Sequence, residues 1–89
     1  MSFLNHSGSY SSNGIKTTTQ TNTVIIFEHP VNSLELINEG TVDMTVKLNS
    51  ESNYHLIKVG EIFKIEDIRI DKITIVENSA MYSYGALYY

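Results

Sequence analysis

The chain has 89 residues, a formal net charge of −4 from 10 acidic against 6 basic side chains, and no cysteine. This length allows one small domain, and the missing cysteine excludes disulfides, a thiolate nucleophile and cysteine-based metal sites. The acidic balance, without a basic stripe, disfavours a nucleic-acid partner. A hydrophobic share of 42% predicts that the chain folds.

The N-terminal segment differs in composition from the rest. Fifteen of the first 23 residues are Ser, Thr, Asn or Gly, and Lys16 is the only charged side chain among them. Such a segment buries little apolar surface against the entropy lost on ordering. We therefore predict a flexible arm over residues 1–22 and one folded domain over residues 23–89. The alternatives are an edge strand over residues 15–23, since Thr favours strands, or an arm ordered against a neighbouring subunit.

The remaining chain predicts strands throughout. The whole sequence has 11 Ile, 6 Val and 8 Thr against 2 Ala, a bias toward pleated sheet. The clearest strand is 42–48, whose strict alternation places four apolar side chains on the core face. We expect residues 33–38 to pair with it through a turn at 38–41. The four core side chains are those of Val42, Met44, Val46 and Leu48.

Two further features bear on the strand pattern. Pro30 lies just after a predicted strand over residues 24–28 and is expected to end it. Farther on, Ile68 and Ile70 are at even positions and Ile73 and Ile75 at odd positions, so in a regular strand the two pairs would point to opposite faces. All four can share one face only if a bulge or tight turn occurs at residues 71–72, which we therefore predict. Six or seven short strands with turn signals every 8–12 residues or so predict an antiparallel β-sandwich or small barrel.

Two groups of side chains are candidates for a chemical site. The histidines lack the spacing of metal ligands, and the carboxylates alternate with basic residues, as in a solvated, self-neutralising edge. We therefore expect no catalytic residue, no metal and no cofactor, and no enzymatic activity. The residues are His6, His29 and His55, and Glu66, Asp67 and Asp71 beside Lys64, Arg69 and Lys72.

The C-terminal segment is uncharged from residue 80 onward and rich in tyrosine. In a continuous strand, one face would carry three tyrosines and the other face three further large apolar or aromatic side chains. A strand that is apolar on both faces is either central in a sheet or covered by another chain. We predict a subunit interface at Met81, Tyr82, Tyr84, Leu87 and Tyr88; an ordinary core strand and a sugar-stacking platform are the alternatives.

Several segments resemble a family of small phage proteins. Residues 34–46 contain an apolar–Asn–x–Gly–x–apolar hairpin motif, and residues 57–63 resemble the family's Val-x-x-Gly-Glu-x-Phe turn. The Ile-Thr-Ile of residues 73–75 and the Tyr-Ser-Tyr-Gly of residues 82–85 follow the same pattern. Over residues 34–85 the chain thus resembles the β-sandwich proteins of Bacillus prophage lytic cassettes.

This resemblance implies a C2-like or jelly-roll-like sandwich without enzymatic activity. It implies a phage-encoded protein that forms a homo-oligomeric ring, a pentamer in the lytic-cassette examples, and takes part in host lysis. The alternative is a virion structural protein, either a head decoration or a tail-associated component. The implied partners are copies of the chain itself and the membrane or cell envelope, with no nucleic acid.

The sequence also bears on location. No stretch approaches the roughly 20 apolar residues of a membrane-spanning helix, and the N-terminus lacks the features of a signal peptide. We therefore expect synthesis in the host cytoplasm, with the virion or cell envelope as the later location. The acidic loop with Glu66, Asp67 and Asp71 does not clearly supply the calcium ligands of a C2 domain. The negative net charge argues against docking on anionic lipids through basic residues.

Overall fold

Two long strands organise the fold, which the computed structural model describes for residues 7–89. They belong to one antiparallel sheet in the order β1-β7-β3-β6-β4-β5, with β2 also paired to β7. Residues 7–89 contain no helix, which confirms the predicted all-β class. The strands are β1 (Gly8–Ser11), β2 (Lys16–Thr17), β3 (Thr23–Asn38), β4 (Met44–Leu48), β5 (His55–Ile57), β6 (Ile62–Ile75) and β7 (Met81–Tyr88).

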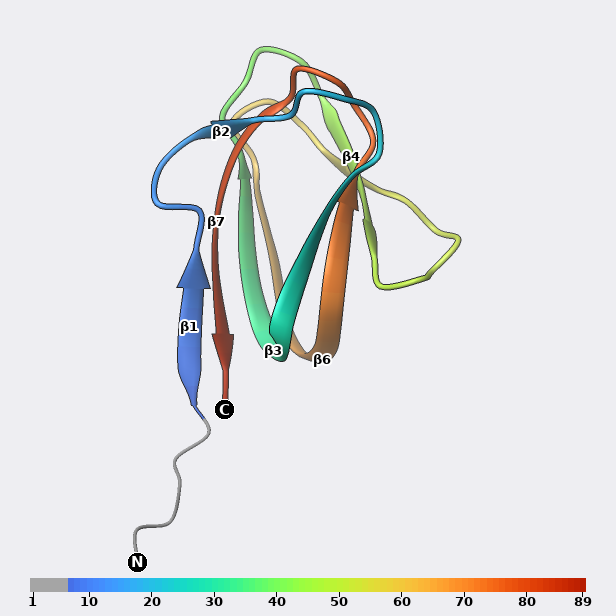
Figure 1. Ribbon diagram of the computed structural model, residues 1–89. Helices are drawn as coiled ribbons and strands as arrows, with labels where there is room; N and C mark the ends of the chain where they lie inside the picture. The colour runs from blue at the N-terminus through green and yellow to red at the C-terminus, as the bar shows by residue number, and fades with distance from the viewer. Residues whose placement is uncertain (1–6) are drawn as a thin grey trace, which may run out of the picture.

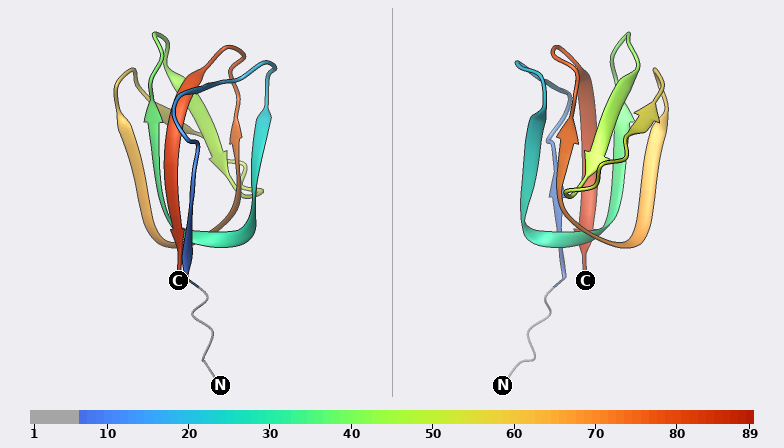
Figure 2. Two further views of the ribbon diagram at one scale, coloured as in Figure 1. Left: turned by 60° about the vertical axis from the view of Figure 1, so that its left-hand side comes forward. Right: turned by 90° about the vertical axis from the view of Figure 1, so that its right-hand side faces the viewer.

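Both long strands bend near their middle, so that the sheet folds over on itself into two layers (Figures 1 and 2). The first layer contains β1, β2, β7, residues 33–38 of β3 and residues 62–66 of β6. The second contains residues 23–26 of β3, the last residues of β6, β4 and β5. The sandwich is thus one continuous sheet. The expectation of only short strands is wrong for β3 and β6, which have 16 and 14 residues.

The core lies between the two layers and is mainly aliphatic. Its fully buried side chains come from the inward faces of β3, β4, β5 and β6, so both layers contribute. The predicted inward face of β4 is confirmed for Met44, Val46 and Leu48. It is wrong for Val42, which precedes the strand and is 54% exposed.

The predicted hairpin between residues 33–38 and 42–48 is also wrong. Residues 33–38 pair with β6 and β7, whereas β4 pairs with β5 and β6. The connecting segment instead crosses between the layers, and the buried Asn38 side chain holds it there. Its Nδ2 donates to the carbonyls of Val42 (2.8 Å) and Ile57 (2.9 Å), and its Oδ1 accepts from the Gly40 N–H (3.0 Å). A buried amide that satisfies backbone groups from several segments fixes their arrangement.

Pro30 does not end its strand, because β3 continues through it to Asn38. The pairing between β3 and β6 shifts register between Ile26 and Val31 and again between Val31 and Ser33. Pro30 lies within this irregular bend and has no residue of β6 paired to it. A proline is compatible with a strand at such a place, where no neighbour needs its missing N–H.

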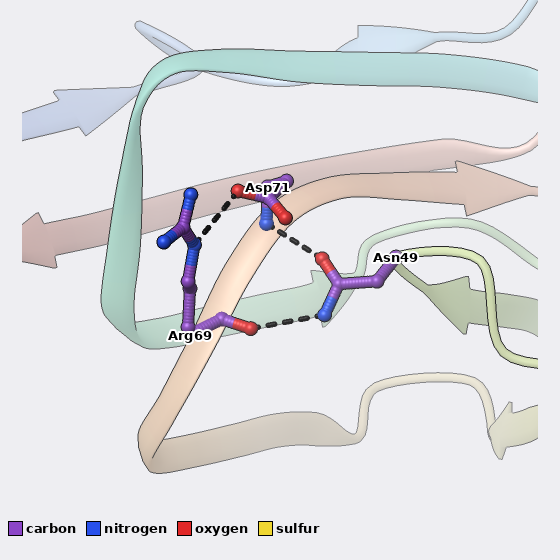
Figure 3. A network of polar contacts seen from close by, with 3 residues as sticks. All are labelled: Asn49, Arg69 and Asp71. Atoms are coloured by element: carbon purple, nitrogen blue, oxygen red, sulfur yellow. Dashed lines mark hydrogen bonds and ion pairs between the residues drawn. The ribbon is translucent and has the colours of Figure 1, made fainter.

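The bend of β6 is held by Asn49, which follows β4 (Figure 3). The Asn49 Nδ2 donates to the Arg69 carbonyl (2.9 Å), and the Asp71 N–H donates to the Asn49 Oδ1 (2.6 Å). The side-chain amide thereby takes the place of a neighbouring strand at this point. The predicted change of parity is confirmed between Ile70 and Ile73, which are both fully buried. The prediction is wrong for Ile68, which is half exposed.

The segment predicted as an arm contributes to the sheet. β1 pairs with β7 from Gly8 opposite Tyr88 to Ser11 opposite Gly85, and β2 pairs with the start of β7. The sheet therefore begins before the boundary predicted at residue 23. The alternative of an edge strand over residues 15–23 holds for Lys16–Thr17 alone. Residues 1–6 of the predicted arm, with His6, lie outside the described residues.

Candidate interaction surfaces

β7 lies inside the first layer, with β1 and β2 on one side and β3 on the other. The predicted division of its two faces is confirmed. Tyr82 is buried, and Tyr84 and Tyr88 are half-buried, whereas Met81 and Leu87 are 39% and 49% exposed. The predicted interface residues therefore separate into an inward group of three tyrosines and an outward pair.

The inward tyrosines belong to an aromatic cluster inside the chain. Tyr10 from β1 lies 5.5 Å from Phe27 and 5.6 Å from Tyr88 between ring centroids. Phe27 packs edge-on against Tyr84 at 5.9 Å. His29, one of the histidines considered as ligands, stacks on Tyr88 at 5.1 Å. Aromatic pairs at these separations stabilise a core beyond the area that they bury. These tyrosines are accordingly packed against their own chain.

Burial affects the ionisation of two of these phenols. It raises the pKa of Tyr82 above the ordinary value of 10.0, and the neighbouring Tyr84 raises this pKa further. Burial also raises the pKa of Tyr84. Both shifts arise because a phenolate loses hydration in the core, so the neutral form is favoured.

The outward side of the first layer, here called the β7 face, is partly apolar. Pairing places Ser83, Ile37 and Ile62 in one row across β7, β3 and β6. Met81 lies one row farther along β7, so apolar side chains gather at this end of the face. The next rows contain Gly85 with Glu35 and Lys64, and Leu87 with Ser33 and Glu66. The face thus combines an apolar end with small and charged residues.

Sequence reasoning missed a second exposed surface, on the first half of β3. Val24 and Ile26 point outward from the second layer, with 46% and 74% of their surfaces exposed. They lie opposite Thr74 and Lys72 of β6. Residues 23–27 form an uncharged apolar run in the sequence. That run was visible, but nothing in the sequence indicated that the strand lies at a sheet edge.

The remaining candidate side chains do not converge. Glu66 pairs with Lys64 at 3.3 Å and Asp71 with Arg69 at 3.1 Å, on exposed parts of β6. His55 packs against Phe63, with ring centroids 5.1 Å apart. Within residues 7–89 there is no group of three or more His, Asp or Glu side chains that could hold a metal ion.

A hollow lies where the two long strands bend, lined by Pro30, Val31, Asn32, Asp67 and Arg69. The Asn32 side chain donates to the Tyr89 carbonyl at 3.1 Å. Its Oδ1 is buried without a hydrogen-bond partner. Both charged side chains of the hollow belong to exposed residues, so it offers little enclosure for a small ligand.

No family model, curated protein or solved structure matches this chain. In the part of the chain that the structure describes, no helix is long and apolar enough to cross a membrane.

Proposed function

We propose that this chain is a non-enzymatic, phage-encoded β-sandwich protein that assembles with copies of itself into a closed ring and acts with the lytic cassette in host lysis. The observation that carries the assembly is the apolar end of the β7 face. Met81 and Ile62 are 39% and 54% exposed there, next to the partly exposed Ile37. Contact with another copy would remove these side chains from water, at about 25 cal/mol per Å² of apolar surface.

The chemistry of this face suits a contact between identical chains. The apolar end is bordered by polar groups such as Ser83, whose Oγ donates to Glu39 Oε2 at 2.6 Å. An apolar centre with a polar rim is the usual composition of an interface between subunits. A head-to-tail contact closes into a ring when its rotation allows closure. The resemblance over residues 34–85 supplies the number five, the phage context and the link to lysis.

The assembly is tested by measuring molar mass with size-exclusion chromatography and light scattering. We expect the chain to elute as an oligomer, and Met81→Glu and Ile62→Glu to reduce its mass because each places a charge in the contact. Val42→Glu is the matched control, since Val42 is as exposed as Ile62 but lies outside the β7 face. A monomer at micromolar concentration, or equal masses for all variants, would contradict the ring.

The biological role is tested separately. Co-expression with the holin and amidase of the same cassette should shorten the time to lysis, compared with the two lysis proteins alone. Leakage of dye from liposomes on addition of the purified protein would support action at the membrane. Finding the chain in purified virions, with no effect on lysis, would instead favour the alternative role as a head-decoration or tail-associated component.

A further inference from the structure

The first half of β3 is an open sheet edge. Residues 23–26 pair with β6 on one side, from Thr23 opposite Ile75 to Ile26 opposite Lys72. No described strand pairs with the other side, and Figure 2 shows this half of β3 at the margin of the sandwich in both views. In antiparallel strands, alternate residues direct their N–H and C=O groups away from a given neighbour. Residues 23–27 therefore direct some of their backbone groups toward solvent.

This edge lacks the protections that sheet edges normally carry. Natural edges are kept from pairing by charged side chains, prolines, bulges or short length. Of the other edges, β1 has three small or polar residues and one tyrosine, β5 has three residues, and residues 62–66 of β6 include Lys64 and Glu66. Residues 23–27 are Thr-Val-Ile-Ile-Phe, without charge or proline.

The open edge ends abruptly at His29. The His29 N–H donates to the hydroxyl of Tyr10 from β1 at 2.9 Å. Pro30 follows, and the register of β3 shifts around it. Beyond residue 28 the strand is therefore closed to a new neighbour by its own chain. The part that remains open is regular and of high strand propensity.

We propose that a second copy of this chain pairs with this edge, antiparallel and about a two-fold axis at Ile25. In this register Val24 of each copy faces Ile26 of the other, and Thr23 faces Phe27. The two most exposed apolar side chains of the edge, Val24 and Ile26, then cover each other. Such cross-strand pairs of β-branched residues stabilise a sheet, and the layer would contain four strands from each copy.

Charge favours this antiparallel register and a second copy as the occupant. The only charged residue next to the run is Glu28, which would lie opposite Asn22 of the other copy. A parallel arrangement of two copies would place the two Glu28 carboxylates side by side, which is unfavourable. The run is therefore complementary to itself in the antiparallel direction alone. An acidic or basic peptide would find no charge partner within residues 23–27.

This contact is separate from the proposed ring. The open edge belongs to the second layer, whereas the β7 face belongs to the first. A two-fold contact added to a ring gives two rings stacked face to face. The two proposals therefore predict different losses of mass, which one set of variants can distinguish.

The test uses two charged substitutions whose side chains face each other across the proposed axis. Val24→Glu and Ile26→Lys should each halve the molar mass, because a lone charge would be buried against an apolar partner. The double variant should restore the mass, since the carboxylate introduced at position 24 would then face the ammonium group introduced at position 26 of the other copy. Leu56→Lys is the matched control, because Leu56 is 54% exposed but lies away from this edge. Thermal unfolding of every variant should show an intact fold, as both substituted side chains point outward.

Several outcomes would overturn the proposal. A wild-type mass that is an odd multiple of the chain mass excludes a two-fold contact at every subunit. Single variants with the wild-type mass would show that the edge is not used, as would capture of an unrelated strand peptide in place of a second copy. A double variant that remains at half mass would overturn the register. A dimer that Ile26→Lys converts to monomer supports the edge contact even where the ring proposal fails.

Discussion

The two long strands each leave one half at a margin of the sandwich, and the two halves differ in how they meet solvent. Residues 23–27 of β3 carry no charge, whereas residues 62–66 of β6 carry Lys64 and Glu66. These two side chains form an ion pair at 3.3 Å, and both are more than half exposed. Charges on an edge strand discourage pairing with another sheet. One margin is thus blocked against association, and the other is open.

The inward sides of the two margins differ as well. Phe27 is almost fully buried and contacts the rings of Tyr10 and Tyr84. Phe63, its counterpart at the charged margin, is half-buried against His55. The open margin is therefore firmly attached to the core even though its outer side is unpaired. A firmly held edge presents its backbone groups with little loss of entropy on pairing.

The largest effect expected from this difference is on stability. Phe27→Ala should lower the free energy of unfolding by about 3–5 kcal/mol, because it removes a buried ring from the aromatic cluster. Phe63→Ala should cost about 1–2 kcal/mol, since part of that ring is already in water. Urea denaturation followed by circular dichroism measures both. Equal losses would contradict the stronger anchoring of β3.

The next effect concerns the bend that separates the two halves of β6. Asn49→Ala should lower the free energy of unfolding by about 1–3 kcal/mol, because the Arg69 carbonyl and the Asp71 N–H lose their partner. Asn49 has a φ of 56°, in the left-handed region that alanine disfavours. Asn49→Gly keeps this conformation and removes the hydrogen bonds. A glycine variant as stable as wild type would show that the amide does not hold the bend.

A smaller effect should accompany ionisation of the buried tyrosines that pack beside Phe27 and along β7. Because burial raises the pKa of Tyr82 and Tyr84 above 10.0, the unfolded chain loses these protons before the folded chain does. The stabilisation is complete below pH 10.0 and is lost as the pH rises through the folded-state values. Urea midpoints below and above this pH, with Tyr82→Phe as control, measure it. If Tyr82→Phe and wild type lose the same amount of stability at alkaline pH, Tyr82 does not contribute to this loss.

The smallest effect on stability is expected from removing the charges of the β6 margin. Lys64→Thr combined with Glu66→Thr should change the free energy of unfolding by no more than about 0.5 kcal/mol, as is usual for an exposed ion pair. It should nevertheless increase self-association, because the second margin then resembles the first. Light scattering against concentration measures this. Unchanged association would show that these charges do not block the edge.

Local patterns in the sequence predicted individual elements well. The alternation over 42–48 placed Met44, Val46 and Leu48 in the core, and the spacing of the C-terminal tyrosines assigned both faces of β7. These predictions succeed because side-chain direction in a strand repeats every two residues. Val42 was misplaced because the pattern does not indicate where a strand begins. The predicted interface residues turned out to lie on both faces of β7 for a related reason. The sequence does not show that Tyr10 and Phe27 cover Tyr84 and Tyr88 on the inward face.

The sequence by itself determined that this chain forms strands, which side of several strands is apolar, and where the phase of β6 changes. Tertiary structure alone decided which strands pair, that β3 runs through Pro30, and that residues 23–27 lie at an edge. The physical reason is the range of the interactions. Strand propensity and alternation depend on neighbouring residues, whereas pairing depends on residues far apart in the chain, such as Asn49 with Arg69 and Tyr10 with His29.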